Sequence, residues 1–209
     1  VTGVQTCALP IFALHGVWSW VSAEQRRVLR DFLASRLKPG GVAYVSYNAK
    51  PGKLLHDPLR RVFRDLSGDA AAPAEHRAAR GMQLLRRCLD SPCGVFEIIK
   101  ERKRIMQALD GKEPSYLAHE YLGDHWESFY CDQVHADLAA ARLTFAATLD
   151  TVLNLEALSV PPALAEDYRR LPSAAQKHLF RDLVLNVAFR KAIFVRGPLP
   201  LTEAGLRSA

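Results

Sequence analysis

The chain has 209 residues and 49% apolar content, which is enough to bury a hydrophobic core in one or two domains. Its formal net charge of +6 comes mainly from arginines scattered over predicted helices with few aromatic residues between them. This pattern is typical of a solvated basic face and not of a nucleic-acid track, so no DNA partner is expected. No apolar run is long enough to span a bilayer, and the three cysteines after residue 11 are irregularly spaced, which argues against a disulfide framework and favours a cytoplasmic location.

The first eleven residues need a separate interpretation. Residues 1–11, VTGVQTCALPI, are identical to the translation of a common short-read sequencing adapter. We interpret them as an assembly scar without meaning for the fold and exclude them, as one excludes a fusion tag. The natural protein is then expected to extend upstream of residue 12.

The first predicted unit is a strand, a helix and a second strand between residues 12 and 48. The first strand ends in a polar and aromatic turn, His15-Gly16-Val17-Trp18-Ser19. Ser22 and Gln25 form a capping box, after which apolar residues recur at helical spacing. Lys38-Pro39-Gly40-Gly41 is expected to end this helix, and the β-branched and aromatic run 42–47 is expected to form a buried parallel strand.

This unit predicts where a ligand would bind. A right-handed crossover places the carboxyl ends of two parallel strands on the same rim of a sheet. Here those ends are His15-Gly16 and Ser46-Tyr47-Asn48. Because ligands in open α/β sheets bind beyond the carboxyl ends of the strands, this rim is the candidate site.

The segment after Asn48 is predicted to be helical. Asp57-Pro58 is a helix start and Gly68 a stop, and further helices are expected over 75–89 and 95–109. The run from Asp110 to Pro114 breaks the pattern, and we place a subdomain boundary there.

The last part of the chain is predicted to combine helices with two strands. Helices are expected over 132–141 and within 155–189. The segments 143–147 and 192–196 indicate strands by their β-branched and aromatic content.

Several of these segments carry a resemblance to a known family. HGVWSWV at residues 15–21, LKPGGVAYVSYN at 37–48, SYLAHEYLGDHWESFY at 115–130 and FRKAIFVRG at 189–197 resemble class I S-adenosylmethionine (AdoMet)-dependent methyltransferases with a methyltransferase regulatory domain. This subgroup includes bacterial protein-lysine methyltransferases that act on outer-membrane proteins. The resemblance implies AdoMet as cofactor and a protein substrate with lysine amines as methyl acceptors.

The resemblance also implies a fold. We expect an α/β chain that forms the C-terminal half of a Rossmann-like methyltransferase sheet with a large helical insertion or second domain. In that fold the last two strands form an antiparallel pair at the sheet edge, and we hypothesise that 143–147 and 192–196 are this pair, with Phe194 near Val45. The expected domains are the C-terminal part of the Rossmann core over 12–52, a helical connector over 53–113, the regulatory domain over 114–200, and a truncated tail over 201–209.

Site residues follow from the rim and from the resemblance. The cofactor is expected to contact His15, Gly16, Val17 and Ser19, and the expected catalytic residues are Trp18, Tyr47, Asn48, Glu120 and Tyr121. Methyl transfer needs alignment more than acid–base catalysis, and aromatic faces can hold a methylated cation while a carboxylate orients the amine. The Gly-rich turn that cradles the cofactor is expected upstream, so the chain alone is expected to be inactive.

Each assignment has a structural alternative. Trp18 could brace the turn, His15 could be a hydrogen-bonded structural residue, Asn48 could form an Asx turn, and Glu120 could pair with an arginine. No metal site is expected, because the spacing of His119, His125, Cys131 and His135 matches no closed zinc site. The alternative function is a non-catalytic helical interaction module that binds protein or RNA.

Overall fold

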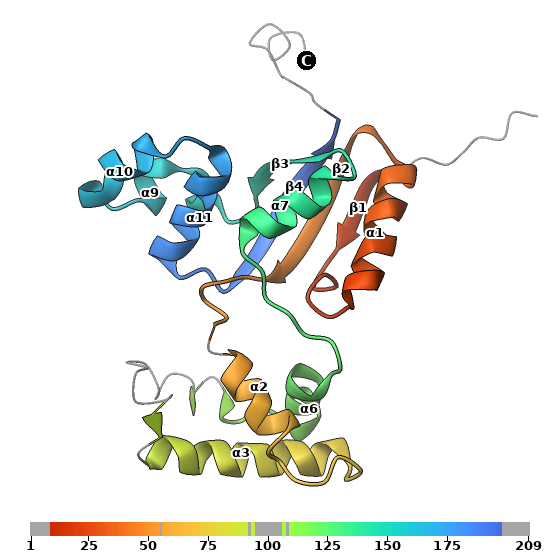
Figure 1. Cartoon of the computed structure of the whole chain (residues 1–209), viewed down its shortest axis with the longest axis vertical. Helices are drawn as coiled ribbons and strands as arrows, with labels where there is room; N and C mark the ends of the chain where they lie inside the picture. The colour runs from red at the N-terminus through yellow and green to blue at the C-terminus, as the bar shows by residue number, and fades with distance from the viewer. Residues whose placement is uncertain (1–8, 55, 92, 95–105, 108, 198–209) are drawn as a thin grey trace, which may run out of the picture. The chain divides into compact units, whose positions relative to one another are not determined.

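The computed structural model describes residues 9–54, 56–91, 93–94, 106–107 and 109–197. The chain divides into two compact units: a sheet unit formed by residues 1–53 and 125–209, and a helical unit formed by residues 54–124. Figure 1 labels their elements. Within the described ranges, no helix is long and apolar enough to cross a membrane.

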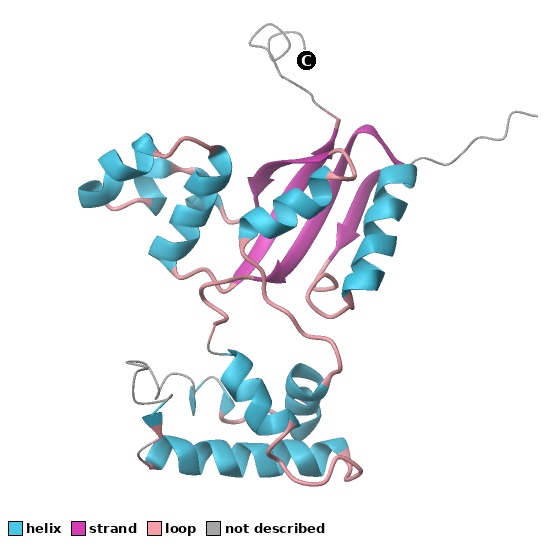
Figure 2. Ribbon diagram, in the orientation of Figure 1, coloured by secondary structure: helices cyan, strands magenta, loops and turns pink. Residues whose placement is uncertain are grey.

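The sheet unit contains four strands in the order β1-β2-β4-β3. β1 and β2 are parallel, whereas β4 is antiparallel to both of its neighbours, as the arrows in Figure 2 show. Phe194 pairs with Ala43, two residues from Val45, so the hypothesis that the late strands complete this sheet is confirmed. The bounds are Leu9–Leu14 for β1, Leu37–Asn48 for β2, Leu143–Thr148 for β3 and Phe189–Arg196 for β4.

The strand directions define one rim. Because β3 is antiparallel to β4 and β4 to β2, the strands β1, β2 and β3 all point the same way (Figure 2). Their carboxyl ends therefore meet at a single edge of the sheet, and β4 begins there. We call this edge the carboxyl rim.

Two helices cover one face of the sheet. Helix α1 (Ala23–Arg36) connects β1 to β2, and α7 (Cys131–Ala139) precedes β3. The predicted capping box is confirmed, since Ser22 accepts from the Gln25 backbone and the Gln25 side chain accepts from the Ser22 backbone. The core between helices and sheet includes the fully buried side chains Trp18, Leu33, Val45, Tyr47, Leu138 and Phe194.

A helical insertion lies between β3 and β4, as predicted for residues 155–189. It consists of α8 (Thr151–Asn154), α9 (Glu156–Ser159), the 3₁₀ helix Pro162–Leu164, α10 (Ala165–Arg170) and α11 (Ala174–Leu185). Asn186 ends α11 in the left-handed conformation, a role that asparagine tolerates well. The insertion thus starts and finishes at the carboxyl rim.

Two features of the first strand pair differ from the expectation. β1 begins at Leu9, inside the segment excluded as an assembly scar. The helix ends before Lys38-Pro39-Gly40-Gly41, as predicted, but the strand expected over 42–47 already starts at Leu37, which pairs with Leu9. Pro39 is compatible with extended backbone, and Gly40, with φ of 77°, absorbs the register shift without ending the strand.

The helical unit has its own core. Its helices are α2 (His56–Arg64), α3 (Ala74–Asp90) and α6 (Pro114–Leu122), which agree with the predicted helix starts and with the break before Pro114. The predicted helix over 95–109 lies mostly outside the described residues. Phe63 is fully buried, and a Cβ at Gly81 would lie 2.5 Å from its ring, so α3 needs a glycine where it packs against α2.

Candidate functional site

The turn after β1 is bound to the end of β2 by side-chain hydroxyl groups. The backbone N–H of Gly16 donates a 2.7 Å hydrogen bond to Oγ of the buried Ser46. His15 shares a 3.1 Å hydrogen bond with the Tyr44 hydroxyl, its ring stacks on that of Tyr44, and its Nδ1 lies 3.4 Å from Ser46 Oγ. The sequence placed His15 and Ser46 on one rim, and the structure joins them directly.

Gly16 takes a backbone conformation that favours glycine, with φ of 69°. No heavy atom lies within 4 Å of the position where its side chain would begin. The turn therefore presents open space beside an exposed imidazole, that of His15, at the carboxyl rim.

A second set of hydrogen bonds connects the turn to the segment that enters α7. Ser19 Oγ accepts from the Asn48 backbone N–H at 2.8 Å, and the Ser19 carbonyl accepts from the Glu127 N–H at 2.9 Å. The Phe129 N–H donates to the Asn48 carbonyl at 3.0 Å. Ser19 therefore fixes the far end of the turn, and its own side chain is buried.

Arg26 of α1 binds the same turn through its guanidinium group. Its guanidinium donates to the carbonyls of Val21 at 2.7 Å and Trp18 at 3.4 Å, and forms a 2.6 Å ion pair with Glu127. It also lies over the Phe129 ring, 4.8 Å from the ring centroid. We did not predict this residue, although its spacing from Leu29 and Leu33 places it on the buried face of α1, which is an unusual place for a charge.

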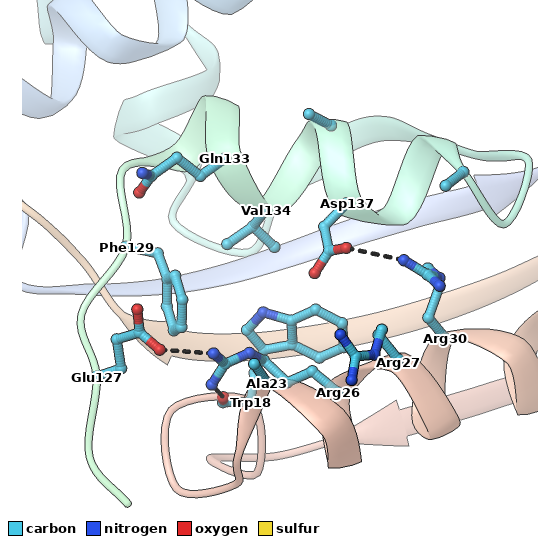
Figure 3. Close-up of a pocket in the computed structure, with 12 residues that line it drawn as sticks. Trp18, Ala23, Arg26, Arg27, Arg30, Glu127, Phe129, Gln133, Val134 and Asp137 are labelled. Atoms are coloured by element: carbon cyan, nitrogen blue, oxygen red, sulfur yellow. Dashed lines mark hydrogen bonds and ion pairs between the residues drawn. The ribbon is translucent and has the colours of Figure 1, made fainter.

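A pocket of about 490 Å³ lies between α1 and α7 (Figure 3). Trp18 and Phe129 contribute its aromatic surface, and the Arg26–Glu127 pair lies at one end. Farther along α1, Arg30 pairs with Asp137 of α7 at 3.2 Å. The arginines of both pairs already bind carboxylates. We therefore interpret the pocket as part of the packing interface between α1 and α7.

Three of the predicted rim residues are largely enclosed. The indole of Trp18 is 1% exposed and lies in the helix-covered core, and Tyr47 is fully buried beneath α7. Burial raises the pKa of the Tyr47 hydroxyl well above its ordinary value. Asn48 is 5% exposed, and its Nδ2 has no hydrogen-bond partner among the described residues. The structure thus favours packing roles for Trp18 and Tyr47 and leaves Asn48 with a donor to spare.

The other two predicted catalytic residues, Glu120 and Tyr121, lie on α6 in the helical unit. Tyr121 is buried, with its ring stacked on Phe63 at 4.6 Å between centroids. Burial raises the pKa of the Tyr121 hydroxyl, with a further contribution from the neighbouring Glu120 carboxylate. Val17, the remaining predicted cofactor contact, is half-buried and packs against the core of the sheet unit.

The zinc set that the sequence analysis rejected does not form in the described part of the chain. No group of three His, Cys, Asp or Glu side chains there could hold a metal ion. His135 is instead enclosed by aromatic rings, stacked on Phe145 at 4.3 Å.

Comparisons with known proteins agree with this geometry. Residues 113–196 match the family described as "Predicted methyltransferase regulatory domain". The chain is 29% identical over 188 residues to the uncharacterized protein sll1526 of Synechocystis sp., and 31% identical over 116 residues to the uncharacterized protein RP028 of Rickettsia prowazekii. These matches cover 90% and 53% of this chain, and 37% and 44% of the relatives.

Two solved structures of PKMT2 from Rickettsia typhi, one in complex with AdoHcy, share the fold. Their TM-scores are 0.70 and 0.71 at 21% and 20% sequence identity, over 92% of this chain. The chain spans 36% of the length of PKMT2, as it spans 37% of sll1526. The resemblance is therefore confirmed: residues 113–196 match the regulatory-domain family, and the chain is methyltransferase-like in fold.

Proposed function

We propose that this chain is part of an AdoMet-dependent methyltransferase that methylates lysine amines of proteins. The observation that carries the proposal is the strand order, because it brings the regulatory-domain strands β3 and β4 into the same sheet as the turn after β1. The name PKMT2 denotes a protein lysine methyltransferase, and one PKMT2 structure contains AdoHcy, the product that AdoMet becomes on losing its methyl group.

The turn fits a cofactor in two respects. Gly16 leaves open space at the rim, and His15 presents an exposed ring that can stack or donate a hydrogen bond. AdoMet, when bound, supplies an electrophilic methyl group on a sulfonium. We propose that His15, Gly16, Val17 and Ser19 form one wall of that site, and that Ser46 and Arg26 hold the wall in place.

Methyl transfer mainly requires that the lysine nitrogen be aligned with the methyl group of AdoMet. The neutral lysine nitrogen attacks in line, a C–N bond forms as the C–S bond breaks, and the bond's electron pair remains on sulfur as a neutral thioether. The methylated ammonium then releases a proton to solvent. In the proposal, Asn48 contributes its spare amide donor at the rim. The catalytic roles expected of Glu120 and Tyr121 on α6 stay predictions.

The chain by itself is proposed to be inactive. It spans little more than a third of PKMT2 and sll1526, and it contains no Gly-rich turn of the kind that cradles AdoMet. We also propose a cytoplasmic location, which is supported by Cys88, Cys93 and Cys131 being free thiols.

Methyl transfer from tritium-labelled AdoMet tests the function. The protein encoded by the complete reading frame would be offered cell-envelope proteins and tRNA in parallel, and mass spectrometry would locate the label. We expect methylated lysine in protein. Label in tRNA, or tRNA binding without any transfer, would contradict the proposal and favour the interaction-module alternative.

A further inference from the structure

A second pocket, of about 320 Å³, opens at the carboxyl rim where the helical insertion begins and ends. It is lined by Asp150, by Val152 and Leu153 of α8, and by the segment Leu185–Phe189. Asp150 lies two residues after the end of β3, and Phe189 is the first residue of β4. The pocket is thus built entirely from the sheet unit.

Backbone pairing places this pocket beside the candidate cofactor wall. Phe189 pairs with Asn48 at the end of β2, and the Ala49 N–H donates to the Ala188 carbonyl at 2.9 Å. The ring of Phe189 packs edge-on against that of His15, with 6.4 Å between centroids. Phe189 therefore lines the pocket and also contacts His15 of the candidate cofactor wall.

The loop that carries Asp150 is held rigidly without using its carboxylate. Asn154 closes the loop through bonds to the Thr148 backbone, accepting at 3.0 Å and donating at 2.7 Å. The Asp150 N–H donates to Thr148 Oγ1, and the Leu149 N–H donates to the Lys191 carbonyl. Asp150 precedes α8, yet its side chain makes no capping hydrogen bond, and no residue in the described part of the chain forms an ion pair with it.

The residues that line the pocket favour a ligand with a cationic group on an aliphatic chain. Apart from Asp150 and Asn186, the residues that line the pocket are apolar, and none of them is basic. A phosphate would meet a carboxylate there and no compensating cation, whereas an ammonium group would find its counter-ion. Lysine combines such a head group with four methylene groups that bury well along apolar walls, and Val152 and Leu185 are each 41% exposed at this surface.

We propose that this pocket binds the lysine side chain of the protein substrate, with Asp150 as counter-ion of the amine and Phe189 and Leu185 against its stem. The inference rests on the proposed function and adds that the Asp150 carboxylate recognises the lysine that accepts the methyl group. The pocket lies on the carboxyl rim and would hold the lysine as its ammonium ion, which must lose its proton to solvent before the nitrogen can attack.

Titration of the chain with Nα-acetyl-lysine methylamide, followed by ¹H–¹⁵N NMR, tests this proposal without cofactor. We expect amide shifts confined to residues 149–153 and 185–189, with a Kd on the order of 10 mM. The Asp150→Asn variant is expected to bind about fivefold more weakly, the factor that an ion pair of about 1 kcal/mol supplies at a solvent-accessible site. Asp167→Asn, which removes an exposed carboxylate of α10 in the same insertion, is the matched control and should bind like the unmodified chain.

Nα-acetyl-norleucine methylamide has the same four-carbon stem without the amine, and it should bind at least fivefold more weakly. Equal binding of the two compounds, equal binding by Asp150→Asn, or shifts elsewhere only would overturn the inference. The outcome is separable from the methyl-transfer assay. Lysine methylation without amine binding here would refute the pocket alone, and amine binding without methyl transfer would refute the proposed function.

Discussion

Two arginine–carboxylate pairs in the sheet unit show how burial decides what an ion pair does. Arg190 of β4 contacts both oxygens of Asp182 of α11 at 2.7–3.0 Å, and the two side chains are 1% and 0% exposed. Arg26 contacts Glu127 at 2.6 Å, but the Glu127 side chain is 53% exposed. If Arg26 is lost, water can solvate the exposed Glu127 carboxylate. If Arg190 is lost, water cannot reach the fully buried Asp182 carboxylate. The first pair therefore maintains the fold, and the second maintains the shape of the rim.

The buried pair also sets the electrostatics of its surroundings. Burial raises the pKa of the Cys131 thiol, which additionally donates to Asp182. Burial lowers the pKa of His135 to about 3 and that of His178 to about 4, and the positive charge of Arg190 adds to both effects. The Arg190–Asp182 ion pair is therefore surrounded by Cys131, His135 and His178, whose neutral forms are favoured.

Loss of the buried pair is the largest effect that we predict. Asp182→Asn would leave the Arg190 charge buried without a counter-ion, and the free energy of unfolding should fall by about 3–5 kcal/mol. Urea unfolding followed by circular dichroism measures this. Glu166→Gln, which breaks an exposed pair with Arg170, is the control and should cost about 0.5 kcal/mol or less. A loss below about 1 kcal/mol for Asp182→Asn would remove the distinction between the two pairs.

The histidines beside Arg190 predict a pH dependence. Both have folded-state pKa values below the ordinary 6.5, so the unfolded chain binds protons more readily than the native one as the pH falls. Stability is fully present above pH 6.5 and declines as the pH falls to about 3, with a loss of up to about 2.5 kcal/mol from His135 at pH 4.5 and a smaller loss from the less buried His178. Urea unfolding at several pH values should show this decline, and the double variant His135→Gln, His178→Gln should reduce it. An unchanged decline in that variant would assign it to other groups.

Arg26→Met tests the exposed pair and should have a smaller effect. We expect a loss of about 1 kcal/mol, because the freed Glu127 carboxylate is rehydrated. The turn itself should loosen, since two of its carbonyls lose their donor. Amide exchange of Trp20 and Asn48, whose N–H groups bond to Val17 and Ser19, should accelerate by roughly fivefold. Arg30→Met, which breaks the other α1–α7 pair, should leave these two rates unchanged.

A stability effect of the same size as that of Arg26→Met is expected for Ser46→Ala. It removes the acceptor of the Gly16 N–H, and this bond contributes about 1 kcal/mol. Thermal unfolding should therefore show a modest decrease in Tm. A loss as large as that of Asp182→Asn would mean that the rim is part of the folding core and not a separately held site.

Much of the fold followed from local patterns. The Ser22–Gln25 capping box and the late strands were predictable because their signals lie within a few residues, and the family resemblance supplied the strand pairing. The extended conformation of Lys38–Gly41 was not predictable, since Pro and Gly mark turns as often as bulges and only the pairing of Leu37 with Leu9 decides between them.

The candidate site was predictable only in part. Strand ends identified the rim, but Glu127 is 101 residues from Arg26 and Asp150 lies across the sheet from His15, so no local pattern connects them. Trp18 and Tyr47 illustrate the opposite error. An aromatic residue near a strand end is consistent with a ligand contact or with a core position, and here the core position prevails.

Calorimetric titration of AdoHcy tests most directly whether the turn at His15–Ser19 forms a cofactor wall. The protein encoded by the complete reading frame should bind in the micromolar range, its Ser46→Ala variant should bind about tenfold more weakly, and the chain of residues 12–209 should show no binding. Micromolar binding by residues 12–209 alone, or an unchanged affinity in the Ser46→Ala variant, would contradict the account.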